Sequence, residues 1–105
     1  MFALVVRFDV VPEQLAAFDE LVQRTIDEIR RHEPGTLAYL STAGDGDPTA
    51  RVFIEVYRDR AAFDEHESMA HTREFLERRE PLLRSFHVEF LESIAGTVAG
   101  ESGRA

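Results

Sequence analysis

The sequence predicts a single α+β domain in which one antiparallel, four-stranded sheet carries both helices on one face. Three observations predict this class. β-forming and helix-forming runs alternate along the chain, a dense turn signal joins the two middle strands, and the chain has only 105 residues. A chain of this length forms one domain around one core. We expect that domain to span residues 1–95 and residues 96–105 to form a flexible C-terminal tail, since the end of the chain offers little to bury.

The first half of the chain predicts a strand, a helix and a second strand. Phe2–Val10 is rich in branched and aromatic residues with apolar side chains at both parities, which predicts a strand covered on both faces. Pro12 opens a helix, along which apolar residues recur at spacings of three and four. Pro34 and Gly35 end this helix, and residues 36–41 form a short strand.

The second half predicts a strand, two helical pieces and a last strand. Residues 44–48 are a dense turn signal, so the strand over residues 51–57 pairs with the strand before it as a hairpin. One helical piece runs from Arg60 to about Met69, and a second runs from about His71 to Arg79, with a break or kink between them. Residues 85–94 alternate like a strand.

The resulting order is βαββαβ, which is the ferredoxin-like split βαβ arrangement. The strands over residues 2–10 and 51–57 carry apolar residues on both faces, although the helices cover only one face. The open face therefore needs a second cover. The simplest cover is the same sheet of another copy, so we expect a homodimer that packs through its sheet faces.

Composition excludes several classes of function. The net charge is −8 and all 12 basic residues are arginine, so an acidic surface argues against nucleic acid as a partner. Without cysteine, neither a disulfide framework nor a thiolate metal site can form. The N-terminus does not read as a signal peptide, and no run approaches the roughly 20 apolar residues of a membrane span. We expect a cytoplasmic protein with no membrane partner.

The stretch from Glu55 to Phe75 holds the candidate pocket. It brings aromatic rings, a thioether and two imidazoles close together on short helical turns, which is typical of a binding or catalytic pocket. These residues are Phe63, His66, Met69, His71 and Phe75. An imidazole can take up a proton near neutral pH, so His66 is a candidate base, although a half-buried structural histidine explains it equally well. Phe63, Met69 and Phe75 are more often core residues than pocket residues.

Strand residues supply the other candidates. Glu55 lies among apolar neighbours and must either find a donor, such as Arg7 or Arg51, or hold a raised pKa. Tyr39 and Tyr57 can bind a ligand oxygen or pack with the hydroxyl at the rim of the core. His66 and His71 are five residues apart, which is no recognised metal-ligand spacing, so we expect no metal site.

The sequence resembles the antibiotic biosynthesis monooxygenase (ABM) family. The matching features are the proline after the first strand, Glu33-Pro34-Gly35 before the second, and the run from Phe53 to His71 with its Ala-Phe lead-in and His-x4-His segment. The resemblance covers about residues 2–95. It implies a dimeric α+β barrel with a pocket between sheet and helices in each subunit.

The resemblance also implies an activity, namely cofactor-free oxygenation of a phenol or quinol. The protein deprotonates a small aromatic substrate, and the resulting anion itself reduces molecular oxygen, so no cofactor is required. His66 would be the base or the partner of the anion, with Glu55, Tyr57 and His71 shaping the site.

Other activities of relatives fit less well. Haem-degrading members use an asparagine and a tryptophan, whereas this chain has neither and His66 stands where the tryptophan would be. Relatives that isomerise phosphorylated sugar-like signals would need an arginine cluster for such a substrate, and only Arg7 and Arg51 are placed to form one. Three hypotheses follow: a cofactor-independent monooxygenase, an isomerase or other proton-transfer enzyme, and a non-catalytic small-molecule-binding dimer.

Overall fold

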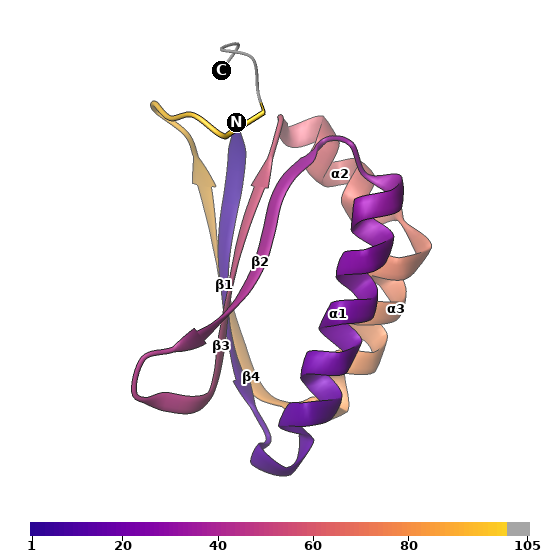
Figure 1. The fold of residues 1–105 in the computed structure, drawn as a ribbon, viewed down its shortest axis with the longest axis vertical. Coiled ribbons are helices and arrows are strands. Elements are labelled where there is room, and N and C mark those ends of the chain that lie inside the picture. Colours follow the sequence, from indigo (N-terminus) through magenta and orange to yellow (C-terminus); the bar gives the residue numbers. More distant parts are fainter. Residues whose placement is uncertain (101–105) are drawn as a thin grey trace.

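The computed structural model describes residues 1–100, and the last five residues of the predicted tail lie outside the described part. Figure 1 shows two layers, a sheet and the helices that cover one of its faces. The strands are β1 (Phe2–Val10), β2 (Thr36–Gly44), β3 (Asp47–Tyr57) and β4 (Leu83–Glu92). The helices are α1 (Leu15–His32), α2 (Arg60–Ser68) and α3 (Ala70–Arg79), with 3-10 turns η1 (Pro12–Gln14) and η2 (Glu80–Leu82).

The sheet has the order β2-β3-β1-β4, and every neighbouring pair is antiparallel. The predicted fold class, a ferredoxin-like α+β domain with both helical segments on one face, is therefore confirmed. In the described residues, no helix is both long and apolar enough to cross a membrane.

The hairpin between β2 and β3 is tighter than the sequence indicates. Only Asp45 and Gly46 form the turn, and Gly46 adopts a positive φ of 74° that a side chain would strain. The acidic and proline residues that follow, Asp47 and Pro48, already belong to β3. Residue types that usually form turns thus occupy the first positions of a strand, because pairing across the hairpin overrides their local preference for turns.

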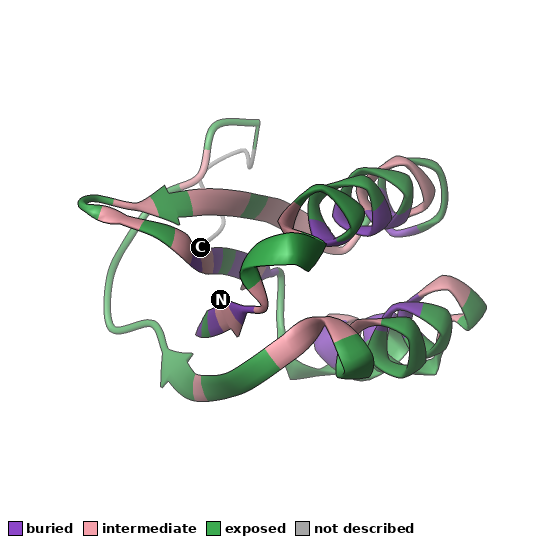
Figure 2. Ribbon diagram, turned by 90° about the horizontal axis from the view of Figure 1, so that it is seen from below, coloured by how far each residue is buried: buried purple, intermediate pink, exposed green. Residues whose placement is uncertain are grey.

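The core lies between the sheet and α1. Alternate residues of β1 point toward the helices and are buried, as are Phe18, Leu21 and Val22 of α1. Figure 2 shows the buried residues on the facing surfaces of the two layers. Aromatic rings dominate the contact: Phe8 packs against Phe18 and Phe53 at centroid distances of 5.3 and 4.6 Å. These contacts fix α1 over the middle of the sheet.

The opposite face of the sheet lies open in the single chain. Leu40, Ile54 and Leu91 are each at least 40% exposed there, and Ile54 lies opposite Val5 and Leu40 in neighbouring strands. The edge strand β4 also leaves Phe86 and Phe90 more than half exposed, on the face that carries the helices. The apolar residues on both faces of the sheet thus agree with the sequence pattern.

A close backbone approach holds the start of α2 against the turn between α1 and β2. A Cβ on Gly35 would lie 2.7 Å from the Cβ of Ala62, which real Cβ atoms essentially never allow. The Arg58 amide donates to the Gly35 carbonyl at 2.9 Å across the same contact. Glycine at one position and alanine at the other therefore let the two segments meet, which explains why Glu-Pro-Gly and Ala-Phe occur together.

We predict that Gly35→Ala lowers the free energy of unfolding by about 1–3 kcal/mol, because the added methyl overpacks the contact with Ala62. Urea denaturation measures the effect. Gly96→Ala is the matched control, since a Cβ there meets only the end of Met1 at 3.9 Å. Equal stability of the two variants would contradict the steric argument.

Candidate functional site

A cavity of about 120 Å³ lies between the sheet and the α2–α3 segment. Its walls are mostly apolar, and its polar groups come from four different elements. Its lining includes Tyr39 of β2, Glu55 of β3, Phe63, His66 and Glu67 of α2, and Thr72, Phe75 and Arg79 of α3. The structure thus brings together five of the residues singled out from the sequence: Tyr39, Glu55, Phe63, His66 and Phe75.

Glu55 is held by the tyrosine two residues further along β3. The Tyr57 hydroxyl, which is fully buried, donates a hydrogen bond of 2.6 Å to Glu55 Oε1. Burial raises the pKa of Glu55, and although the Tyr57 hydrogen bond and nearby His66 oppose this, the pKa rises to about 7. Burial and the neighbouring Glu55 also raise the pKa of Tyr57 well above its ordinary value, so Tyr57 stays a donor. The carboxyl of Glu55 can therefore exchange a proton near neutral pH.

The expected partners of Glu55 are not those the sequence suggested. Arg7 lies on the open face of the sheet, opposite the face that carries Glu55, and pairs with Asp47 at 2.9 Å. Arg51 shares the face of Glu55 but pairs with Asp19 of α1 at 2.9 Å. The expectation of an Arg7 or Arg51 ion pair is corrected, and Arg7 does not reach the cavity, because strand alternation points it away.

His66 is oriented by a carboxylate that the sequence analysis did not select. Glu33, just after α1, lies 2.8 Å from His66 Nδ1 through Oε1, and the Thr36 hydroxyl donates to the same oxygen at 2.7 Å. Burial raises the pKa of Glu33, but the hydrogen bonds from His66, Thr36 and His71 outweigh it and lower the pKa to about 2. An ionised carboxylate only accepts hydrogen bonds, so Nδ1 of His66 carries the proton.

Because Nδ1 is turned toward Glu33, which does not line the cavity, the edge of the ring that carries Nε2 is the one left to line it. Nε2 makes no hydrogen bond to any described residue, and His66 is 4% exposed and lines the cavity. Tyr39, Tyr57 and Phe63 surround the ring at centroid distances between 5.3 and 6.4 Å. A buried carboxylate, a fixed tautomer and a free Nε2 lone pair are what a general base needs.

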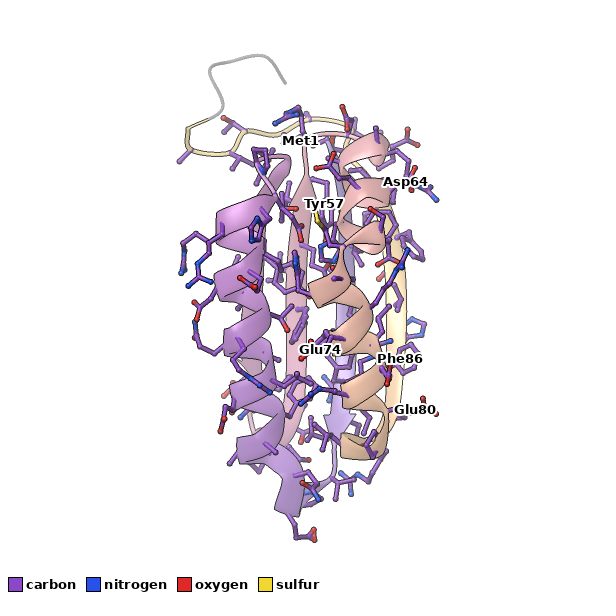
Figure 3. All side chains as sticks on the ribbon, turned by 90° about the vertical axis from the view of Figure 1, so that its right-hand side faces the viewer. Met1, Tyr57, Asp64, Glu74, Glu80 and Phe86 are labelled. Atoms are coloured by element: carbon purple, nitrogen blue, oxygen red, sulfur yellow. The ribbon has the colours of Figure 1, made fainter. Side chains whose placement is uncertain are left out.

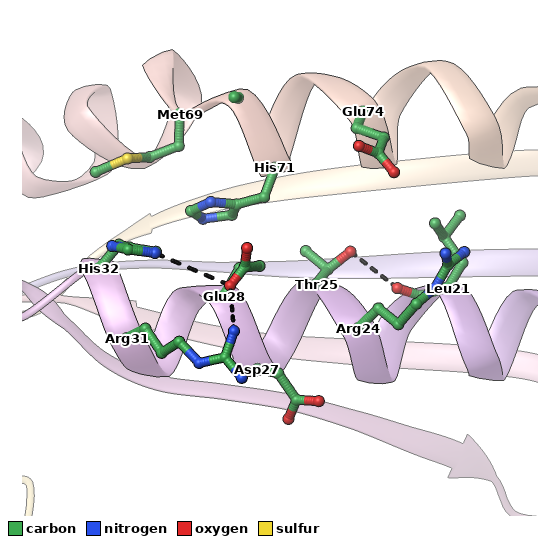
Figure 4. Close-up of a pocket in the computed structure, with 11 residues that line it drawn as sticks. Leu21, Arg24, Thr25, Asp27, Glu28, Arg31, His32, Met69, His71 and Glu74 are labelled. Atoms are coloured by element: carbon green, nitrogen blue, oxygen red, sulfur yellow. Dashed lines mark hydrogen bonds and ion pairs between the residues drawn. The ribbon is translucent and has the colours of Figure 1, made fainter.

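His71 and Met69 lie in a second space, outside the inner cavity. An open groove of about 590 Å³ runs between α1 and α3, and Figure 4 shows both residues facing α1 across it. His71 Nε2 is hydrogen-bonded to Glu33 Oε2, the oxygen that His66 does not use. Met69 has an extended backbone, with φ −69° and ψ 144°, which separates α2 from α3 and confirms the predicted break. This break lets two histidines five residues apart reach one carboxylate.

Arg79 is a further cavity residue that the sequence analysis did not select. Its guanidinium lies over Phe8, Phe75 and Phe86, at 4.6 to 5.6 Å from the ring centroids. It forms no ion pair with a described residue. Burial lowers the pKa of Arg79, yet a guanidinium stays charged at neutral pH. The cavity therefore contains a cation that is not neutralised by a close ion pair, although the charges of Glu67, Glu55 and Glu80 act on it, and such a cation can attract an anion.

A signal in the sequence pointed to one of the two missed residues and not to the other. Glu33 is an acid placed after a helix and before the only Pro-Gly pair, at a position where a chain turns into the core. Arg79 differs from the exposed Arg78 beside it, which pairs with Glu74 at 3.3 Å, only through its place on the helix.

Figure 3, which looks onto the helical face, shows α1 beside the α2–α3 segment with Tyr57 between them. Within residues 1–100, no group of three His, Cys, Asp or Glu side chains is arranged to hold a metal ion.

Comparisons with known proteins agree with this architecture. The sequence model of a family described as antibiotic biosynthesis monooxygenase matches residues 1–78. A crystal structure named antibiotic biosynthesis monooxygenase is 26% identical, with a TM-score of 0.81, and the match covers 90% of this chain and 100% of that one. A structure from Mycobacterium tuberculosis is 28% identical over 90% of this chain and 96% of that chain, with a TM-score of 0.82.

A third structure, from Shewanella oneidensis, is also 28% identical, over 86% of this chain and 87% of that chain, with a TM-score of 0.79. No curated protein matches the sequence. The similarity therefore covers at least 86% of this chain in each of the three structures, while each of these identities stays below 30%.

We predict that Glu55→Gln is more stable than the wild type at pH 8, by on the order of 2–3 kcal/mol. The pKa of Glu55 rises from 4.5 to about 7 on folding, so its protonated form favours the folded state. That stabilisation is complete below pH 4.5 and is lost as the pH rises through 7. Glutamine, which never ionises, still accepts the Tyr57 hydrogen bond. Urea denaturation at pH 5 and pH 8 measures the difference, and a difference independent of pH would contradict this account.

Proposed function

The chain belongs to the antibiotic biosynthesis monooxygenase family, and we propose that it is a cofactor-independent monooxygenase that oxidises a phenolic or quinol-type aromatic substrate with molecular oxygen. The observation that carries the proposal is the geometry of His66. Its Nδ1 is bound to Glu33 at 2.8 Å, and its Nε2 is free toward an aromatic cavity. The same protein groups can bind, deprotonate and shield a hydroxyaromatic ring.

His66 acts as the base in this proposal. Its Nε2 takes the hydroxyl proton of the substrate, and the ionised Glu33 stabilises the imidazolium that forms. Arg79, whose guanidinium lies over the ring of Phe75, lines the same cavity and attracts the phenolate by charge. Tyr39 and Phe63 flank the ring of His66 and exclude water from it.

Glu55 gives and takes back the other proton that the reaction requires. The substrate anion reduces oxygen and forms a peroxide at a ring carbon, which the protonated Glu55 converts to a hydroperoxide. Glu55, now ionised, removes the hydrogen from that carbon while the O–O bond breaks and a carbonyl forms. The released hydroxide takes the proton from His66 and leaves as water. Both groups return to their starting states, and the products are a quinone and one water molecule.

The size of the cavity favours a small substrate. A volume of about 120 Å³ is close to the roughly 150 Å³ that holds a single benzene ring in a protein interior. Exposed Phe90 and Leu76 stand at the open side, so a substituent can extend outward from the first ring. We therefore favour a single-ring quinol over a polycyclic one.

A second reaction class uses the same residues without oxygen. His66 and Glu55 are two proton-exchanging groups on one cavity, which is the minimum that an isomerase or another proton-transfer enzyme requires. Oxygen dependence separates the two reactions. A non-catalytic small-molecule-binding dimer is the third possibility, and it requires neither residue to act on protons.

We also propose that the protein is a homodimer that packs through its open sheet faces. Exposed apolar side chains of three strands, Leu40, Ile54 and Leu91, form a patch that a monomer would leave in water. An isologous pairing of two sheets buries this patch on both copies at once.

We predict oxygen uptake by metal-stripped protein with monocyclic quinols, above the autoxidation rate without protein. His66→Ala lowers that uptake by about 100-fold or more, the usual contribution of a positioned base, while anaerobic binding of the quinol remains. An oxygen electrode and a fluorescence titration under nitrogen measure the two quantities.

Each of the other outcomes supports a different function. Uptake equal to the blank across mono- and polycyclic quinols counts against an oxygenase. Anaerobic turnover that still needs His66 supports the isomerase. Binding that survives in His66→Ala, with no turnover by either protein, supports the binding dimer.

We predict that the wild type sediments as a dimer at micromolar concentration and that Ile54→Glu sediments as a monomer, because the substitution places a charge in the apolar patch. Ile94→Glu is the control, since Ile94 is 98% exposed and lies beyond β4. A wild-type monomer, or a dimer that survives Ile54→Glu, would overturn the proposed interface.

A further inference from the structure

Glu33 separates two spaces that the fold keeps apart. Its side chain is 2% exposed, and each of its two oxygens is hydrogen-bonded to a different imidazole. His66, on one oxygen, lines the inner cavity, whereas His71, on the other, lines the open groove between α1 and α3. One buried carboxylate thus lies between the inner cavity and a groove that is open to solvent.

The charge of this group is limited by burial. With Glu33 ionised and both rings neutral, the three side chains carry one buried negative charge, and with both rings protonated they carry one positive charge. Exactly one imidazolium leaves the group neutral, which is the state that burial favours. The geometry therefore supports one protonated ring at a time, on either side of Glu33.

The resting position of that proton follows from the surroundings. The side chain of His71 is 12% exposed, against 5% for His66, so a cation is better solvated on His71. The charged and titratable groups on the groove side are Arg24, Asp27, Glu28, Arg31, His32 and Glu74. Those on the cavity side are Tyr39, Glu55, Glu67 and Arg79, with Tyr57 behind Glu55.

Acidic and basic groups face both rings. In the groove, Arg31 is already paired with Glu28 at 2.9 Å, and Glu74 lies on the same helix as His71. In the cavity, the cation of Arg79 opposes a second cation on His66, whereas an ionised Glu55 favours it. Charges of both signs face each ring, so the greater exposure of His71 is what places the imidazolium there and leaves the neutral base on His66.

We propose that His71 is a charge-compensating partner of the base, so that His66 takes up a proton in the inner cavity as His71 releases one into the outer groove. The atoms balance without a proton passing through Glu33. An O–H bond of the substrate breaks and an Nε2–H bond forms on His66. An N–H bond of His71 breaks, and its proton goes to water or buffer in the groove. When His66 gives its proton back, His71 takes one from the groove.

The catalytic use of this exchange rests on the proposed function, whereas the sharing of one proton does not. His71 touches neither the cavity nor a substrate in it, so it acts through Glu33 and His66 as a positioning residue. A purely structural His71 would hold Glu33 in place but would not change the protonation of His66.

The test is nitrogen-15 NMR of the histidine rings, which reports the protonation state and tautomer of each ring without any substrate. Near pH 7 we expect His66 to be neutral with the proton on Nδ1, and His71 to be doubly protonated. In His71→Gln, whose amide can still donate to Glu33 but holds no exchangeable charge, we expect His66 to become doubly protonated. His32→Gln is the control, because the His32 ring stacks beside His71 at a centroid distance of 6.2 Å but is not hydrogen-bonded to the Glu33 carboxylate, and this variant should keep the wild-type pattern.

The outcomes separate this inference from the proposed function. A neutral His66 in folded His71→Gln, or two neutral rings in the wild type, overturns the compensation. The wild-type spectrum decides the matter even if the variant does not fold. With a quinol that the wild type oxidises, His71→Gln should lower the neutral-pH rate by about tenfold or more and recover it as the pH rises. Absence of oxygen uptake by the wild type counts against the oxygenase and leaves the NMR result as it stands.

Discussion

The carboxylate of Glu33 is the constraint on which the arrangement of this site depends. It follows the last turn of α1, it is nearly inaccessible to solvent, and its two oxygens fix one histidine from α2 and one from α3. An unpaired carboxylate at this depth would cost several kcal/mol, so both imidazoles are held in place by the need to satisfy it. The break at Met69 separates the two helices that carry these histidines, and the contact between Gly35 and Ala62 keeps the start of α2 close to the turn that carries Glu33.

The same constraint divides the chemistry between two environments. Inside the cavity, His66 keeps a fixed tautomer among aromatic rings, and Glu55 holds a proton that it can release near neutral pH. On the outside, His71 meets solvent in the groove. Placing two titratable groups in environments that treat their charged forms differently is the usual way in which a fold obtains both an acid and a base.

Much of the fold could be predicted from the sequence, because hydrophobic period and turn residues act locally. The apolar stripe of α1, the two-sided strands and the break near Met69 all appear in the structure. Strand ends were harder to predict, since Asp47 and Pro48 are turn formers that enter β3 only because β2 pairs beside them. The site was predicted only in part. His66 and Glu55 stand out by residue type, but the partners of each depend on strand register and helix placement, which no local pattern contains.

Arg7 and Glu33 illustrate that limit in opposite directions. Arg7 is near Glu55 in register, since the two lie in paired strands, yet side chains at odd and even positions of β1 point to opposite faces, so the pair never forms. Glu33 is 33 residues from His66 in the chain and contacts it directly. The sequence nevertheless contained the reason for that contact. A glycine and an alanine that allow two segments to touch are as informative about a site as the acid and the base, because they determine which charged groups can meet. A sequence in which Glu33 is retained but Gly35 and Ala62 are enlarged should therefore keep the fold class and lose the orientation of His66.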